Sequence, residues 1–164
     1  MSKGRVWKYG DDVNTDVIFP GRFTYQIMDA AELAKHALED LDAEFAKNVK
    51  PGDVIVAGKN FGCGSSREQA AACLRAAGVQ AVIAKSFARI YFRNAINLGL
   101  AVLQCAEASD ALRTGDEVEV DFPGGRIISG ERVFNFFPLP ASVIGIIEAG
   151  GLIEYTKKKL AAAR

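Results

Sequence analysis

Residues 54–84, VIVAGKNFGCGSSREQAAACLRAAGVQAVIA, contain the pattern that decides the fold of this chain. The stretch begins with a continuous apolar run over 54–58, which is typical of a strand buried on both faces. A glycine-rich loop follows, and then an alanine-rich helical pattern over 67–78 that ends at Gly78. A second buried strand is predicted over 79–84. This strand–helix–strand order predicts parallel strands covered by helices.

The same alternation continues on both sides of this stretch. Ser86 and Gly99 are residue types that begin and end a helix, and Asp29 is a candidate N-cap for another. Residues 117–122 alternate apolar and polar, and the PGG that follows predicts an antiparallel hairpin. The other expected elements are strands 5–9 and 100–105, helices 29–41 and 86–99, and a C-terminal helix broken or bent near Gly150 and Gly151. We expect one α/β domain over 1–164, with a mixed, partly parallel sheet or barrel flanked by helices.

Composition limits the class of protein. Of the 164 residues, 49% are hydrophobic and 24% charged, as in globular domains. Lys and Arg together number 20, as do Asp and Glu, so we expect neither a nucleic-acid nor a membrane partner. The first residues lack the apolar segment of a secretory signal, and no run of about 18 apolar residues is present. We therefore expect a cytoplasmic protein.

The cysteines and the single histidine give little support for a metal centre. Cys63, Cys73 and Cys105 are too widely spaced for a CxxC zinc site, a disulfide framework or the grouped thiolates of an iron–sulfur cluster. Cys73 lies in an alanine-rich helical pattern, where a small buried residue is expected. His36 has charged neighbours on a polar helix and is expected to be a solvated surface residue. We expect no metal bound by this chain.

The loop between the first buried strand and its helix is a candidate anion site. Gly62 and Gly64 permit positive φ, so that successive backbone N–H groups can form a concave nest. Ser65 and Ser66 add hydroxyls, and Arg67 adds a planar fork that grips carboxylate or phosphate. In the alternative interpretation, one serine only caps the helix. The lysine of a P-loop is missing after the glycines, which disfavours nucleotide binding.

Four stretches of the chain resemble a known enzyme family. GKNFGCGSSREQA and AKSFARIYFRNAINLGL lie in the middle, DDVNTDVIFPGRF near the start and EAGGLIEYTKKKL near the end. Together they resemble the small subunits of aconitase-type hydro-lyases, and most closely the isopropylmalate dehydratase (isopropylmalate isomerase) members. The resemblance covers nearly the whole chain and implies the swivelling β/β/α domain.

The resemblance also implies an activity and a partner. Family members remove water from a hydroxy dicarboxylic acid and add it back, with a [4Fe–4S] cluster as Lewis acid. The cluster belongs to a large subunit, so the resemblance implies a heterodimer or heterotetramer in which this chain binds no cofactor. The main expectation is the interconversion of 2- and 3-isopropylmalate in leucine biosynthesis. A non-catalytic anion-binding module is the alternative from another class.

Residue roles follow from the same resemblance. It makes Ser65 the catalytic base, and Ser66 and Arg67, with Gly64, the groups that bind a substrate carboxylate. A serine is a plausible base only where backbone N–H groups and a cation stabilise its alkoxide, which this loop can provide. Asp16 is a candidate orienting residue, with a buried turn-forming aspartate as the alternative.

The loop after Pro20 is where the family distinguishes substrate side chains. This chain has Phe23, Thr24, Tyr25 and Gln26 there, and lacks the arginine that homoaconitase-type relatives use for an additional carboxylate. An apolar or weakly polar substituent is favoured, because an unpaired buried charge is costly. The close alternatives to isopropylmalate are 2,3-dimethylmalate and methylmalate/citraconate, and homocitrate-type substrates are disfavoured. Loop 21–28 is expected to be mobile without the partner, because contacts to ligand and partner are missing. Two points stay open: whether Arg22 reaches inward, and whether 134–140 is core or interface.

Overall fold

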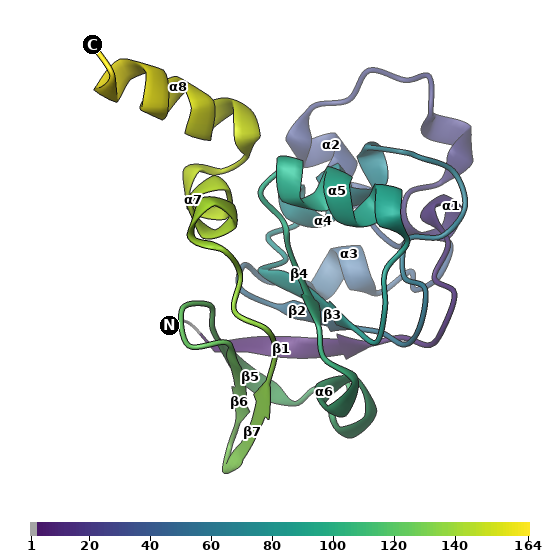
Figure 1. Cartoon of the computed structure of the whole chain (residues 1–164). Coiled ribbons are helices and arrows are strands. Elements are labelled where there is room, and N and C mark those ends of the chain that lie inside the picture. The colour runs from purple at the N-terminus through teal and green to yellow at the C-terminus, as the bar shows by residue number, and fades with distance from the viewer. Residues whose placement is uncertain (1–2) are drawn as a thin grey trace.

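The computed structural model describes residues 3–164 as one mixed sheet with helices on both faces (Figure 1). Its seven strands are ordered β4-β3-β2-β1-β5-β6-β7. Neighbours from β4 to β1 are parallel, and neighbours from β1 to β7 are antiparallel. The strands are β1 Lys3–Lys8, β2 Val54–Val56, β3 Ala81–Ala84, β4 Ala101–Gln104, β5 Glu117–Asp121, β6 Arg126–Ser129 and β7 Arg132–Asn135. The predicted mixed α/β architecture is confirmed.

The helices complete the layers. They are α1 Thr15–Ile18, α2 Ala30–Lys35, α3 Phe45–Asn48, α4 Gln69–Ala76, α5 Arg89–Asn97, α6 Ala106–Ala111, α7 Ala141–Ala149 and α8 Leu152–Ala162, with a 3₁₀ turn at Gly21–Phe23. Helices α4 and α5 cover one face of the parallel strands and α6 lies on the other (Figure 1). Helix α6 connects β4 to β5 and was not predicted from the sequence.

The parallel half explains the apolar runs of the sequence. Val54 of β2 pairs with Val6 of β1 on one side and with Ala81 of β3 on the other. Every residue of β2 and β3 is buried, because helices cover one face and the curled antiparallel part covers the other. Side chains from successive positions therefore enter two different cores, as Ile55 and Val54 do. The carboxyl ends of β1 to β4 meet at one edge, where open α/β sheets bind ligands.

Two predicted helix boundaries are wrong. Asp29 caps α2 as predicted, but the helix ends at Lys35, short of residue 41. Leu38 has a φ of 57° and is fully buried, so the chain leaves the helix to place this side chain in the core. Ser86 does not cap α5, because its Oγ accepts the backbone N–H of Asn60 at 2.8 Å.

A buried carboxylate joins the start of the sheet. Asp53 is 4% exposed and precedes β2 directly. It accepts hydrogen bonds from the backbone N–H of Arg5 at 2.9 Å, the indole N–H of Trp7 at 3.0 Å and the backbone N–H of Lys50 at 3.0 Å. These three donors fix β1 and the preceding turn against β2.

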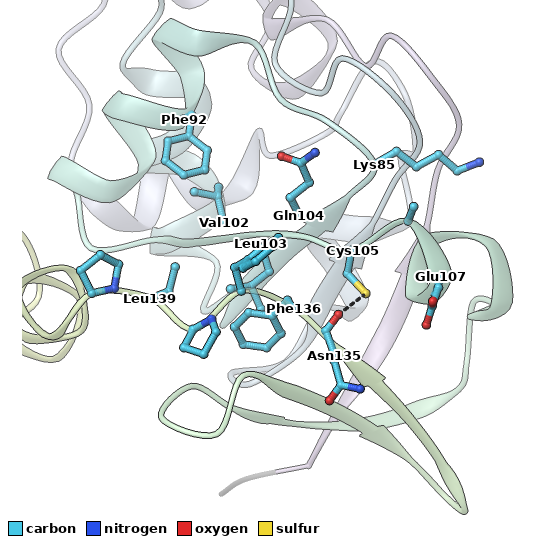
Figure 2. A pocket seen from close by; sticks show the side chains of 14 residues that line it. Lys85, Phe92, Val102, Leu103, Gln104, Cys105, Glu107, Asn135, Phe136 and Leu139 are labelled. Atoms are coloured by element: carbon cyan, nitrogen blue, oxygen red, sulfur yellow. Dashed lines mark hydrogen bonds between the residues drawn. The ribbon is translucent and has the colours of Figure 1, made fainter.

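Segment 134–140 is both core and surface. Phe134 and Phe136 are 8% and 6% exposed and belong to the core under the antiparallel strands, whereas Phe137 is 94% exposed. The segment also contains the end of β7, a strand that was not predicted from the sequence. Figure 2 shows it beside β4, where the two line a cavity of about 700 Å³. The backbone carbonyl of Asn135 accepts the Cys105 thiol across it at 3.4 Å.

The chain ends in two helices, as the glycine pair predicted. Helix α7 stops at Gly150, which has a φ of 89°, and α8 starts after Gly151. Helix α8 points away from the sheet (Figure 1). Across residues 3–164, no helix is long and apolar enough to cross a membrane.

Candidate active site

The glycine-rich loop lies at the carboxyl ends of the parallel strands. After β2 the chain runs beside the segment that follows β1, with a parallel bridge between Asn14 and Cys63. A second bridge joins Phe61 to Phe87, beyond β3. The segments that follow three neighbouring strands are therefore tied together at the predicted edge.

Both glycines of the loop are required where they stand. Gly62 has a φ of 80°, and a Cβ there would lie 2.1 Å from Cγ of the buried Tyr91 ring. Gly64 has a φ of 97°, and a Cβ there would lie 2.6 Å from Asn14 Oδ1. The sequence prediction of positive φ at both positions is confirmed.

The interpretation of a loop serine as a helix cap is wrong. Helix α4 begins at Gln69, and its N-cap residue, Glu68, makes no side-chain capping bond. Ser65 and Ser66 lie outside the helix, and both are exposed. Within residues 3–164, the backbone N–H groups of Gly64, Ser65 and Ser66 find no acceptor. Hydroxyls and donors at this loop are thus available to a ligand.

Thr15 positions the Ser65 side chain and is a site residue that the sequence reasoning missed. It is 1% exposed, and its Oγ1 lies 3.0 Å from the backbone oxygen of Ser65 and 3.2 Å from Ser65 Oγ. Since Thr15 has one hydroxyl hydrogen, donation to the carbonyl leaves Thr15 Oγ1 as acceptor for the Ser65 hydroxyl. Its position beside the candidate Asp16 was the only available signal.

The Arg67 guanidinium lies between Asp16 and Gly21. Its side chain is 20% exposed, and Nη1 lies 2.6 Å from Oδ1 of Asp16. The N–H is not aimed at that carboxylate, so the contact is an ion pair without a hydrogen bond, and buried Nη1 lacks an acceptor among the described residues. Asp16 is 56% exposed, so the alternative of a buried turn-forming aspartate is wrong. Gly21 lies against the fork, since a Cβ there would be 2.9 Å from Nη1.

The loop expected to read the substrate has a fixed start and an exposed tip. Tyr25 is 99% exposed, and Gln26 is exposed next to it. Thr24 is half-buried and its backbone oxygen accepts Gln69 Nε2 at 3.4 Å. Phe23 turns away from the tip and packs on Phe19, with ring centroids 6.1 Å apart.

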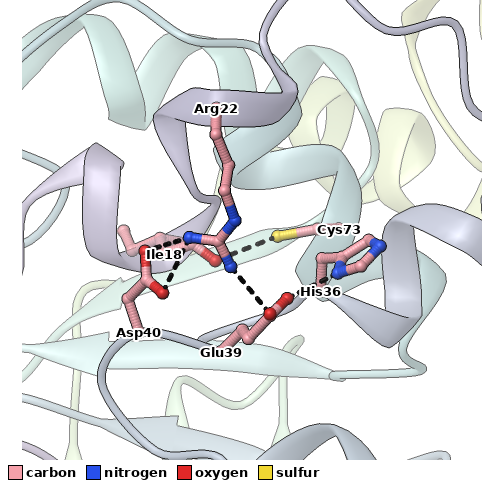
Figure 3. A network of polar contacts seen from close by, with 6 residues as sticks. All are labelled: Ile18, Arg22, His36, Glu39, Asp40 and Cys73. Atoms are coloured by element: carbon pink, nitrogen blue, oxygen red, sulfur yellow. Dashed lines mark hydrogen bonds and ion pairs between the residues drawn. The ribbon is translucent and has the colours of Figure 1, made fainter.

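Two expectations next to this loop need correction (Figure 3). Arg22 does not reach inward, because it pairs with Glu39 and Asp40. His36 is not a solvated surface residue: its side chain is 24% exposed and its ring stacks on Phe23 at 4.1 Å. The Phe23 ring covers one side of His36, a contact that the charged neighbours of His36 in the sequence did not indicate.

The three thiols do not fit a shared cluster. Cys73 lies in the core under α4, Cys105 in the core under the antiparallel strands, and Cys63 on the glycine-rich loop. Burial raises the pKa of the Cys63 thiol, and the negative charge of Asp12 raises it further. Across residues 3–164, no three His, Cys, Asp or Glu side chains are grouped as metal ligands. The cavity beside β4 is lined by residues between 85 and 140 and is separate from this loop.

Known proteins give this geometry a context. Residues 22–108 match the Aconitase C-terminal domain family. The 3-isopropylmalate dehydratase small subunit of Thermodesulfovibrio yellowstonii is 52% identical over 161 residues, covering 96% of this chain and 95% of that protein. The chain belongs to the family of 3-isopropylmalate dehydratase small subunits. Small subunit 1 of Archaeoglobus fulgidus is 55% identical over 157 residues, covering 94% of this chain and 96% of that one.

A solved structure agrees with the fold. The crystal structure of 3-isopropylmalate dehydratase from Methanocaldococcus jannaschii aligns with a TM-score of 0.90 and 45% identity, over 98% of this chain and 96% of that one. The predicted family and the predicted swivel-domain fold class are thereby confirmed.

Proposed function

We propose that this chain is the small subunit of a heteromeric hydro-lyase that interconverts 2- and 3-isopropylmalate by dehydration and rehydration, as a step of leucine biosynthesis in the cytoplasm. The name shared by relatives about half identical over the full chain supports this. The structural observation that carries it is the Ser65 loop. Consecutive residues there offer backbone N–H groups without acceptors, two serine hydroxyls that cap no helix, and an arginine whose buried Nη1 lacks a hydrogen-bond acceptor. We also infer that residues 1–164 form a single domain, since one sheet runs through the described chain.

In this proposal the substrate carboxylate is bound by Arg67, Ser66 and the backbone N–H groups of the Ser65 loop. A carboxylate that reaches the fork of Arg67 gives buried Nη1 the acceptor that it lacks. The Ser66 hydroxyl and the backbone N–H groups of Gly64, Ser65 and Ser66 add donors to the same anion. Asp16 holds the guanidinium in place through its ion pair while leaving N–H hydrogens free.

Ser65 is the proposed base. Dehydration removes a proton from one of the two carbons that bear a carboxylate and the hydroxyl from the other. Rehydration in the opposite sense adds the proton to the carbon that lost the hydroxyl, and water supplies the new hydroxyl to the first carbon. The Ser65 alkoxide is stabilised by nearby backbone donors and the Arg67 charge, and the Thr15 hydroxyl can rotate to donate to it. The carbanion that develops is stabilised by the same charge through the adjacent carboxylate.

The rest of the reaction requires a partner. The proposal assigns a [4Fe–4S] cluster to a large subunit, where it would supply Lewis-acid assistance to loss of the hydroxyl. Large and small subunits would assemble as a heterodimer or heterotetramer. This chain would bind one carboxylate of the substrate, transfer the proton and contribute the substrate-specificity loop at 23–26.

The loop favours an apolar substituent. With Arg22 paired to two carboxylates, the tip that carries Tyr25 has no cation for a third substrate carboxylate. Phe23 and Thr24 shape the start of the tip, and Gln26 offers only neutral polar groups. Isopropylmalate carries an alkyl group at the corresponding carbon, which such a loop accepts without an unpaired charge.

Reconstitution tests the proposal. The chain is co-purified with the large subunit of its own organism under anaerobic conditions and assayed by the absorbance of unsaturated dicarboxylates. The substrate panel contains isopropylmalate, 2,3-dimethylmalate, citraconate and homocitrate. We expect the highest kcat/KM with isopropylmalate and no turnover by the chain alone. A complex that turns over none of these acids, or prefers homocitrate, refutes the proposal.

A further inference from the structure

Arg22, at the start of the substrate-specificity loop, belongs to a network of polar contacts with Glu39, Asp40 and His36 (Figure 3). The Phe23 ring closes this network into a ring of contacts, because it packs against both His36 and Arg22. Arg22 Nη1 donates to both oxygens of Asp40 at 3.1 Å, and Nη2 donates to Glu39 Oε1 at 2.7 Å. The second oxygen of Glu39 lies 2.5 Å from His36 Nδ1. The His36 ring packs against the Phe23 ring, and the Arg22 guanidinium lies 4.8 Å from the centroid of the same Phe23 ring. Arg22, Glu39, His36 and Phe23 thus each contact two other members of the ring, and Asp40 joins it through Arg22.

The acidic side of this ring is rigidly placed. Leu38 is fully buried, and its backbone N–H donates to the carbonyl of Ile18 at 2.8 Å. The thiol of Cys73, on α4, donates to the same carbonyl at 3.6 Å. Because Leu38 is fixed in this way, the next two residues, Glu39 and Asp40, present their carboxylates at a set position.

The other side of the ring touches the proposed active site. Gly21, next to Arg22, lies against the Arg67 fork, where a Cβ would be 2.9 Å from Nη1. Two residues further on, the Thr24 carbonyl is held by Gln69 of α4. A shift at Arg22 therefore moves both the wall beside the fork and the first residues of the tip.

We propose that the ring formed by Arg22, Glu39, Asp40 and His36 positions the loop at 23–26 over the Arg67 fork and thereby sets substrate selectivity. Arg22 is a positioning residue in this assignment and does not contact the substrate. The ion pairs are partly exposed, with 52% of the Arg22 side chain accessible, so they contribute little to global stability. Their role is geometric, since a loop displaced by about 1 Å can cost up to about 100-fold in rate.

The test uses the reconstituted complex and rests on the proposed function. The variants are Arg22→Gln, Arg22→Lys and the charge swap Arg22→Asp with Asp40→Arg. The readouts are kcat and KM for isopropylmalate and 2,3-dimethylmalate, together with the melting temperature. Arg126→Gln is the matched control, because Arg126 makes a similar half-exposed pair with Asp121 at 2.7 Å on the β5–β6 hairpin.

We expect Arg22→Gln to raise KM for isopropylmalate and to change the ratio of the two kcat/KM values by about tenfold at an unchanged melting temperature. The Lys variant and the swap should restore part of the ratio, and Arg126→Gln should leave it unchanged. Equal loss on both substrates, or an unchanged ratio in Arg22→Gln, overturns the inference. A wild-type complex inactive on every acid refutes the proposed function instead.

Discussion

Replacing Arg67 by lysine keeps the positive charge and removes the planar fork. In the structure the fork has a buried Nη1 without an acceptor, which we assign to a substrate carboxylate. Each hydrogen bond from a charged donor to a carboxylate contributes about 1.5–3 kcal/mol. Lysine can replace one of two such bonds, so kcat/KM should fall by about 10–150-fold, at about 1.4 kcal/mol per factor of ten.

The assay is steady-state hydration by the reconstituted complex, with urea unfolding of the free chain measured in parallel. The pair with Asp16 is half-exposed, so the free energy of unfolding should change by less than about 1 kcal/mol in Arg67→Lys. Arg126→Lys, which alters an equivalent pair far from the loop, should leave kcat/KM unchanged. Wild-type kcat/KM in Arg67→Lys would refute the assignment of the fork to substrate binding.

Three further predictions concern the scaffold. Gly62→Ala should lower the free energy of unfolding by about 2–5 kcal/mol, because the alanine is strained at positive φ and its Cβ overlaps the Tyr91 ring. Gly115→Ala has open space around its Cβ and should show the cost of the backbone strain alone. Equal losses of stability in the two variants would contradict this. Asp53→Asn replaces one carboxylate oxygen by an N–H₂ group that faces at least one of the three N–H donors, and it should cost about 2–4 kcal/mol in urea unfolding. Wild-type stability would argue against this. Because its pKa is raised, little of the Cys63 thiol is ionised at neutral pH. Alkylation by iodoacetamide should therefore be slower than for cysteine in an unfolded peptide and should accelerate as the pH rises. Rapid alkylation of Cys63 at neutral pH would contradict this.

Local signals were sufficient for most of the fold. The all-apolar strands and the glycines at helix ends are short-range patterns, and β2, β3, α4 and the hairpin after β5 lie where they were predicted. Prediction failed where a distant contact overrode a local preference. Ser86 is a good N-cap by type, but the N–H of Asn60 occupies its hydroxyl. Leu38 continues a helical pattern, yet the core takes its side chain and ends the helix early.

In the candidate active site, too, local features could be predicted and long-range contacts could not. Ser65, Ser66 and Arg67 are adjacent in sequence, so a motif brings them together without knowledge of the fold. The contact between Thr15 and Ser65 spans 50 positions and could not be read from spacing. The same holds for Arg22, whose carboxylate partners lie beyond a helix whose end was misplaced. Long-range pairing therefore decides which polar side chains are free for substrate.

The most direct measurement is the turnover of Ser65→Ala in the reconstituted complex. A positioned base contributes about 10²–10⁴-fold, so kcat for isopropylmalate should fall by that factor while KM changes little. Ser66→Ala serves as the matched neighbour and should raise KM while leaving most of kcat. The account predicts this separation between adjacent serines. A Ser65→Ala complex that retains wild-type kcat would contradict the assignment of Ser65 as the base.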